Sequence, residues 1–524
     1  MKKFIRNLFS GYLLIIFLLF IEVALLLIFQ FKMDDIVVTI FNLDKADVKV
    51  TLIVAAAYII FRIIGYIMAF IIFFKILNKA ENPEFKIPWL VGILLLPFFF
   101  SIMFIIFGNH GLRKKDKRII KGFESKYEKE YIVDDQVDLG TACGTFKYIN
   151  HAIKLGCHPN NRITYYKTGE DFFPVLIESL KTAKEFIFME FFIIADGKYW
   201  TEVKNILIEK AQAGVEVRLI YDDMGCGGTI ASNTARKLRK YGIKSYKFHP
   251  FRPILSGMYN NRDHRKIVII DHEMAFTGGM NLADEYGNLI KRFGYWKDTM
   301  VKIEGSAINN LIITFLQNFD LATHKPSDYD KYIKYEYKKY EGSGYIMPFG
   351  DGPGGIDDAL IGEQTYINIL HYAKHEVFIS TPYLVPTYGL IDALRNAAMR
   401  GVKVHLIVPG IPDKKLVYRV AETNFKYLME AGVKIYRYTP GFNHMKTILA
   451  DGKLAMVGTI NFDFRSLVHH FECGAVIYKN ECLKDVLDDF HEMLSVSEEV
   501  PKTFKQKSST RLLCAVLKII TPLM

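Results

Sequence analysis

The chain repeats one stretch of sequence, and this repeat constrains the fold more than any other feature. Each copy holds a His, a Lys, an Asp, a Gly and an Asn in the same order and at the same spacing. The two sets are His264, Lys266, Asp271, Gly278 and Asn281, and His444, Lys446, Asp451, Gly458 and Asn461. Apolar residues fill the interval from Lys to Asp and follow again after the Asp, so each copy predicts a β-hairpin.

The spacing within each hairpin brings the polar side chains to one face. Side chains two residues apart on a strand share a face, so each His and its Lys point the same way. If the turn centres on His272–Glu273, His264 lies opposite Asn281, and the second copy has the matching arrangement with Asn461. A nucleophile or acid, a fixed positive charge and an amide on one face suit a phosphate, so both Asn residues are predicted to support phosphate binding.

The Asp of each copy stands apart from this face. At an odd spacing from the His, Asp271 and Asp451 fall on the other face or in the turn, so they are poor candidates for orienting the imidazole. We nevertheless predict them as members of the catalytic set, because they complete the repeated pattern. Asp298 and Glu472, each at the start of the next apolar strand, are better candidates to fix the imidazole tautomer.

The repeat extends well beyond the hairpins. Ala213–Ile220 matches Arg400–Ile407, and Tyr241–Tyr246 matches Ala431–Tyr436, each as a helix end followed by a buried strand. A duplication of this length implies two similar α/β domains, with mixed sheets flanked by helices, packed together. The predicted regions are a membrane region at 1–108, a basic polar connector at 109–160, a first half at 161–324, a linker at 325–344, a second half at 345–500 and a tail at 501–524.

Three long apolar runs precede the repeats, at 11–30, 51–74 and 88–107. Each run is long enough to cross about 30 Å of hydrocarbon as a helix, which predicts a multi-pass membrane protein. A basic cluster at 111–118 follows the third run and favours a cytoplasmic location for the repeats. Three spans would then place Lys2, Lys3 and Arg6 outside, so either one run is re-entrant or the larger cluster dominates.

The formal net charge is +11 with a pI near 9, which suits an anionic partner. The apolar runs favour phospholipid over nucleic acid, because a protein tethered at the bilayer meets lipid phosphates. The six cysteines show no paired metal spacing, and we interpret them as free thiols. We predict neither a metal site nor another cofactor.

The duplicated pattern resembles the phospholipase D superfamily. Together with the apolar runs, the basic connector and the segments 263–286 and 295–298, it is similar to bacterial cardiolipin synthases. This chain has three apolar runs where that family usually has two, and Thr459 where Ser is commoner. The resemblance implies that phosphatidylglycerol and other anionic phospholipids are the partners, and that one phosphatidylglycerol donates its phosphatidyl group to another at a bacterial cell membrane.

The residues suggest double displacement through a phosphohistidine. One His attacks phosphorus while the other protonates the leaving alkoxide, and the Lys and Asn residues hold the non-bridging oxygens. The resemblance favours His264 as the nucleophile and His444 as the acid and base. Two other readings stay open: a hydrolytic phospholipase or membrane-tethered nuclease with the same His pair, and a non-catalytic lipid-binding scaffold.

Overall fold

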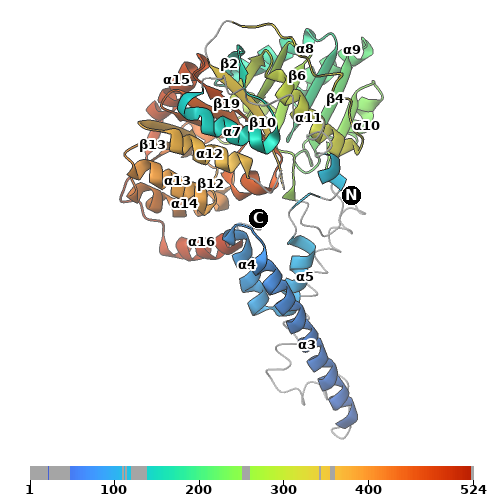
Figure 1. Cartoon of the computed structure of the whole chain (residues 1–524), viewed down its shortest axis with the longest axis vertical. Helices are drawn as coiled ribbons and strands as arrows, with labels where there is room; N and C mark the ends of the chain where they lie inside the picture. Colours follow the sequence, from blue (N-terminus) through green and yellow to red (C-terminus); the bar gives the residue numbers. More distant parts are fainter. Residues whose placement is uncertain are drawn as a thin grey trace. The chain divides into compact units, whose positions relative to one another are not determined.

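The computed structural model describes residue 22 and the ranges 48–108, 111–112, 115–119, 139–250, 260–340, 344–353 and 360–520. The chain divides into two compact units. One contains the apolar N-terminal segments, and the other contains both copies of the repeat (Figure 1).

The second unit contains two mixed sheets of the same strand order. The sheet of the first half runs β2–β9–β7–β6–β3–β4–β5, with β3, β4 and β5 parallel and the other pairs antiparallel. Its strands are β2 (Arg162–Tyr166), β3 (Phe186–Phe191), β4 (Glu216–Asp222), β5 (Lys244–Phe248), β6 (Lys266–Ile270), β7 (Met274–Gly278) and β9 (Met300–Glu304).

The sheet of the second half repeats this order and adds a strand at each edge, giving β1–β10–β19–β17–β16–β11–β13–β14–β20. Its strands are β1 (His158–Pro159), β10 (Tyr345–Asp351), β11 (Glu376–Ser380), β13 (Lys403–Pro409), β14 (Lys434–Tyr438), β16 (Thr447–Ala450), β17 (Leu454–Gly458), β19 (Glu472–Tyr478) and β20 (Ser497–Glu499). The predicted pair of similar α/β domains is therefore confirmed. The edge strand β1 comes from the segment that the sequence presented as a connector.

Helices accompany these two sheets, and most of them bury one apolar face. They are α7 (Cys143–Ile153), α8 (Gly169–Lys181), α9 (Lys198–Gln212), α10 (Thr234–Arg239), α11 (Ile308–Thr323), α12 (Ile361–Tyr372), α13 (Tyr388–Met399), α14 (Lys415–Glu430), α15 (Cys482–Ser495) and α16 (Ser508–Ile520). Thr168 and Thr387 cap α8 and α13 by accepting a hydrogen bond from a backbone N–H of the first turn. The buried helix α11 packs on β10, β5 and β6, so one apolar core joins the two halves.

Short elements complete the region between the halves. They are the helical turns η1 (Gly140–Ala142), η3 (Asp284–Gly287) and η5 (Arg465–His469) and the strands β8 (Tyr295–Lys297), β12 (Leu384–Val385), β15 (Gly441–Asn443) and β18 (Phe462–Asp463). The parallel pair of β8 and β15 joins the first half to the second. The hydroxyl of Thr277 on β7 lies 3.2 Å from the thiol of Cys473 on β19, so the two sheets also meet directly.

Both hairpins turn half a residue earlier than the sequence suggested, which shifts the cross-strand partner of each position by one residue. Ile270 pairs with Met274, which leaves Asp271, His272 and Glu273 as a three-residue turn. Asp271 and its counterpart Asp451 adopt the left-handed conformation there, with φ of 51° and 50°. The expectation that His264 lies opposite Asn281 on the strand ladder is wrong, because both residues lie beyond the paired strands.

In the other unit, α3 (Val48–Asn78) supplies the one helix of the described ranges that is long and apolar enough to cross a membrane. Several of its apolar side chains are exposed, among them Phe70 and Ile71. Of the first apolar run only Glu22 is described. Its carboxylate accepts hydrogen bonds from the backbone N–H groups of Phe98 and Phe99 at 3.2 and 2.7 Å.

The third apolar run is not one long span. It breaks at Leu96 into α4 (Pro83–Leu95) and α5 (Pro97–Phe107), where Pro97 begins a new helix. The rings of Trp89 and Phe104 lie 5.4 Å apart, so the chain reverses and the two helices form a hairpin. With 13 and 11 residues these helices reach only about 20 and 17 Å, short of the roughly 30 Å of a bilayer core.

Candidate active site

The two repeated histidines lie where a segment of one half crosses to the other. The backbone N–H of His264 donates to the carbonyl of Phe471 at 2.8 Å, and that of His444 donates to the carbonyl of Lys297 at 2.7 Å. Each His precedes its central strand and hydrogen-bonds to the opposite half. Both side chains are buried, with 6% and 7% of their surface exposed.

Each imidazole is paired with a carboxylate of the other half. His264 Nδ1 lies 2.9 Å from Glu472 Oε2, and His444 Nδ1 lies 2.6 Å from Asp298 Oδ2. Both carboxylates are fully buried. The sequence singled out these two acids, and the structure adds that the pairing is crossed. In each imidazole Nε2 is left as the atom that can meet a substrate.

Two buried lysines accompany the histidines. Lys266 Nζ donates to the carbonyl of His264 at 2.5 Å, and Lys446 Nζ donates to the carbonyl of His444. Burial lowers the pKa of Lys266 to about 8 and that of Lys446 to about 7, although nearby carboxylates oppose the shift. An anion between them would favour their charged form, so the pair suits a phosphodiester.

The two imidazoles differ in their electrostatic surroundings. Burial, followed by the charge of Lys266, lowers the pKa of His264 well below its ordinary value. Burial also lowers the pKa of His444, to about 4, and Lys446 adds to the shift while Asp298 opposes it. Both rings therefore favour the neutral form, and His444 has the carboxylate that offsets part of this preference.

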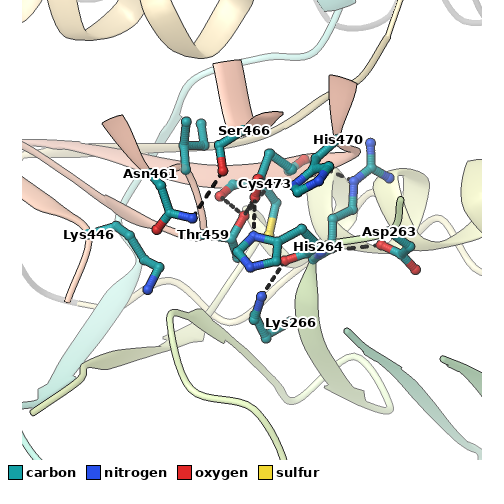
Figure 2. Close-up of polar contacts among 12 residues, drawn as sticks. Asp263, His264, Lys266, Lys446, Thr459, Asn461, Ser466, His470 and Cys473 are labelled. Atoms are coloured by element: carbon teal, nitrogen blue, oxygen red, sulfur yellow. Dashed lines mark hydrogen bonds and ion pairs between the residues drawn. The ribbon is translucent and has the colours of Figure 1, made fainter. Parts of the chain in front are cut away.

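The amides of the two repeated Asn residues have defined hydrogen-bond partners. Asn281 accepts a hydrogen bond from the backbone N–H of Ile193 at 2.9 Å and donates to the hydroxyl of Tyr286 at 2.6 Å. Asn461 donates to Ser466 Oγ at 3.1 Å (Figure 2). Each amide nitrogen carries a second hydrogen, which is the one that a phosphate oxygen would use.

The assignment of Asp271 and Asp451 to the catalytic set needs correction. Asp271 accepts hydrogen bonds from the backbone N–H groups of Lys184, Glu185 and Phe186 at 2.7 to 2.8 Å. Asp451 accepts three such bonds at the start of β11, and these donors lower its pKa although partial burial opposes them. Seven residues of extended chain put each Asp about 23 Å from its His, so both acids hold a turn at the far end of the sheet.

Aromatic rings surround His444, which sequence reasoning missed. Tyr286, Trp296 and Phe442 lie with ring centroids 5.5, 5.7 and 5.5 Å from His444. They come from η3, β8 and β15. Tyr286 and Trp296 follow the first motif closely in the sequence, which could have indicated that they lie near the site. No sequence feature indicated Phe442.

His264 has one aromatic ring beside it, that of Phe192 at 5.0 Å, and its other neighbours are more polar. The ring of His470 lies 5.4 Å away, and its Nδ1 lies 3.5 Å from Glu472 Oε1. Figure 2 shows His470, His264 and Thr459 close together. Thr459 donates its hydroxyl to Glu472 Oε2 and accepts the backbone N–H of Cys473 at 2.9 Å.

His264, His470 and Glu472 have donor atoms within 4.8 Å of one another, which is a spacing that a metal ion could use. The chemistry of this set fits an anion site better. Glu472 already contacts His264 Nδ1. The positive charge of Lys266 lowers the pKa of His264 and His470, and that of Arg262 lowers the pKa of His470. A cation would have to displace the proton between His264 and Glu472 against that charge.

A second buried network lies behind His264. Glu190 accepts a hydrogen bond from Asn318 Nδ2 at 2.7 Å and lies within hydrogen-bonding reach of Asp263. Burial raises the pKa of Glu190 well above its ordinary value and that of Asp263 to about 6. The pair therefore retains a proton that Glu190 can donate to Asp263.

Comparison with known proteins identifies the family. A family model described as "Cardiolipin synthase, PLD-like domain" matches residues 176–313 and 366–494. An uncharacterized protein of Streptococcus mutans serotype c (strain ATCC 700610 / UA159) is 40% identical over 459 residues, which cover 86% of this chain and 98% of that protein. A cardiolipin synthase of Geobacillus sp. (strain WCH70) is 32% identical over 470 residues, which cover 87% of this chain and 92% of the relative.

Among solved structures, the phosphatidylserine synthase of Haemophilus influenzae Rd KW20 shares the fold. The TM-score is 0.54 at 14% identity, over 74% of this chain and 98% of that chain. The duplicated hairpins, the two matching sheets and these relatives lead to one conclusion: the chain belongs to the cardiolipin synthase family, whose members carry phospholipase D-like domains.

Proposed function

We propose that this protein makes cardiolipin by transferring a phosphatidyl group from one phosphatidylglycerol to a second, with release of glycerol. The observation that carries the proposal is the crossed pair of buried His–carboxylate contacts between two buried lysines. A membrane phosphatidyltransferase needs such a pair, because a phosphodiester anion must be bound and one proton must be moved in each step.

In the first step Nε2 of His264 attacks phosphorus in line, and the bond from phosphorus to the glycerol headgroup oxygen breaks. His444, which must bind the anionic substrate in its protonated form, gives the proton on Nε2 to that oxygen, so glycerol leaves and a phosphatidyl-histidine remains. The electrostatic surroundings support His264 as nucleophile: burial and Lys266 lower its pKa well below the ordinary value and favour the neutral ring, whereas Asp298 raises the pKa of His444 against the effect of burial.

In the second step His444 takes the proton from a glycerol hydroxyl of another phosphatidylglycerol, and this oxygen attacks phosphorus. The phosphorus–nitrogen bond breaks, which frees His264 and yields cardiolipin. Lys266, Lys446, Asn281 and Asn461 hold the non-bridging oxygens in both transition states. Burial of both imidazoles supports transfer to an alcohol over hydrolysis, because it limits the access of water.

The test uses the purified full chain in vesicles with labelled phosphatidylglycerol. Cardiolipin and glycerol should appear in equal amounts, and both should vanish in His264→Ala and in His444→Ala. Acid-labile label on the peptide containing His264 would identify the covalent intermediate. Phosphatidic acid as the product would make the protein a hydrolase, and label on His444 would reverse the two roles.

We also propose that the catalytic unit faces the cytoplasm of a bacterial cell. The hairpin of α4 and α5 supports this placement. With three spans, the basic N-terminus and the basic cluster at 111–118 would lie on opposite sides of the membrane, and a third run that turns back removes this conflict. If the first run and α3 both cross the bilayer, Lys2, Lys3 and Arg6 share a side with the basic cluster at 111–118. A Cys introduced at Lys115 should then resist an impermeant thiol reagent in intact cells, and its labelling would contradict the placement.

A further inference from the structure

Two exposed segments of the catalytic unit, one a loop and the other a loop that leads into the first turn of α14, carry apolar and basic side chains together. Leu289 and Ile290 are 48% and 53% exposed and are followed by the exposed Lys291. Ile411 and Leu416 are 43% and 44% exposed, with the exposed Lys415 between them. We call these six residues the rim.

The two loops of the rim lie side by side in space. A Cβ on Gly294, just after the first loop, would lie 3.2 Å from Cδ1 of Ile411. The backbone N–H of Ile411 donates to the carbonyl of Gly441 at 3.2 Å, and Gly294 forms an isolated bridge with Gly441. Both loops therefore meet at the start of the paired strands β8 and β15.

These paired strands lead directly to the site. β15 runs from Gly441 to Asn443, and His444 follows it. β8 runs alongside and is followed by Asp298, the carboxylate partner of His444. Three residues of extended strand separate Gly441 from His444, which is about 10 Å.

Aromatic side chains pack against one another along these two strands between the rim and His444, and we call this packed set the aromatic route. The ring of Phe293 lies 6.3 Å from Trp296 and 6.1 Å from Phe442, and these two rings lie 5.7 and 5.5 Å from His444. The route from the rim to His444 is therefore apolar on this side. Such a surface suits the glycerol backbone and the first carbons of an acyl chain better than it suits a sugar or a nucleotide.

We propose that the rim docks onto an anionic phospholipid bilayer and delivers the phosphatidyl group to His444 along this aromatic route. The apolar residues enter the interface, and the two lysines contact headgroup phosphates. Interfacial segments bury their apolar side chains roughly 5–10 Å deep, which matches the length of the route. Each basic residue near an anionic surface strengthens binding roughly five-fold. Delivery to His444 rests on the proposed function, whereas the docking itself does not.

The direct test is photocrosslinking of the full chain reconstituted in vesicles of phosphatidylglycerol and phosphatidylcholine. A benzophenone amino acid replaces Ile290 in one protein and Met399 in a control. Met399 is 72% exposed and precedes β13, whereas Ile411 follows that strand, so about 23 Å of strand separates them. We expect a lipid adduct at 290 and little or none at 399.

The same crosslinking in a His264→Ala background separates docking from catalysis, because it requires no turnover. A lipid adduct at 290 in that protein supports the rim even if the wild type makes no cardiolipin. An adduct to protein at 290, the absence of an adduct, or equal lipid adducts at 290 and 399 would each overturn the proposal.

A kinetic test examines delivery. Leu289→Asn with Ile290→Asn should raise several-fold the mole fraction of phosphatidylglycerol needed for half-maximal rate, and should leave the maximal rate unchanged. The control is Met399→Asn with Tyr241→Asn, which removes two exposed apolar side chains just before β13 and β5. An unchanged requirement in the rim variant, or an equal change in the control, would refute delivery through the rim.

Discussion

The two halves have the same strands in the same order, yet they surround their histidines differently. His444 lies among three aromatic rings, whereas His264 lies beside one, that of Phe192, together with His470 and the longer carboxylate Glu472. The shared framework places two imidazoles, and the residues that differ give each its own environment. We interpret this difference as the basis for two roles, one nucleophile and one acid and base.

The contrast extends to the residue that supports each carboxylate. In the second half Thr459 donates its hydroxyl to Glu472. The equivalent residue of the first half is Gly279, and a Cβ there would lie 2.0 Å from Asp298 Oδ1. The shorter carboxylate thus needs a glycine beside it, and the longer one has room for a hydroxyl donor.

Replacing the carboxylates of Glu472 and Asp298 should lower turnover more than any other change, and should distinguish the nucleophile from the acid and base. Glu472→Gln and Asp298→Asn should each lower turnover by about 10²- to 10⁴-fold, because the tautomer and the imidazolium lose their acceptor. A phosphatidyl ester with a nitrophenol leaving group needs no proton from His444. It should therefore restore much of the phosphoenzyme formation in Asp298→Asn but not in Glu472→Gln, as measured by rapid quench.

Equal rescue of the two variants by this substrate would contradict the division of roles. The nitrophenyl ester given to the wild-type protein is the control for its own reactivity.

Gly279→Ala should have the next largest effect. The new methyl group displaces the Asp298 carboxylate, and a misplacement of this size costs about 100-fold in turnover. Thr459→Ser is the matched control in the second half and should retain nearly full activity, because it keeps the hydroxyl. Steady-state cardiolipin synthesis measures both variants, and full activity of Gly279→Ala would show that Asp298 can move without cost.

The buried pair Glu190 and Asp263 should make stability depend on pH. The second half has the neutral pair Ser380 and Asn443 at the equivalent positions, with Asn443 Nδ2 donating to Ser380 Oγ at 2.8 Å. A carboxyl whose pKa is raised on folding stabilises the protein at low pH, and this contribution is lost as pH rises through the folded value. For Asp263 the loss falls between about pH 4 and 6 and is on the order of 3 kcal/mol.

The double variant Glu190→Ser with Asp263→Asn introduces the neutral pair into the first half. Its thermal midpoint should vary less with pH over this range than that of the wild type. Parallel pH profiles of the two proteins would be evidence against a shared proton in the pair.

His470→Asn should have the smallest effect. The charge of His470 contributes to the lowered pKa of His264, so its removal should raise that pKa slightly. Since the nucleophile must be neutral, the acidic limb of the activity profile should move to higher pH by a fraction of a unit. The charges that shift the pKa of His444 are those of Lys446, Asp298 and Lys266, so the basic limb should stay in place. A shift of the acidic limb to lower pH would refute this account.

Much of the fold could be predicted, because a duplicated pattern with two matching hairpins leaves few architectures. Asp298 and Glu472 were also identifiable from their places at strand starts. Their crossed pairing was not, because it depends on how the halves pack and no local pattern encodes it. The same limit applies to Phe442 and His470, which reach the site through the β8–β15 pairing and the end of η5.

Two expectations were wrong, although the sequence held a signal against each of them. Pro97 within the third apolar run was a signal that a helix starts there, but the length of the run outweighed it. Asp271 belongs to the repeated pattern, yet its distance along the strand and its place in a turn exclude it from the centre. The repeated pattern therefore combines candidate catalytic residues with a residue that, in the first half, holds the hairpin to β3.

The crossed carboxylates also bear on how such a protein could arise and be taken apart. A single half has an imidazole without its partner, so an ancestor with one copy would have worked as a symmetric dimer, each subunit lending its acid to the other. Joining two copies in one chain made that exchange permanent and allowed each half to specialise. Two fragments divided at the segment 325–344 should then be inactive alone and regain activity only when they are produced together in one cell.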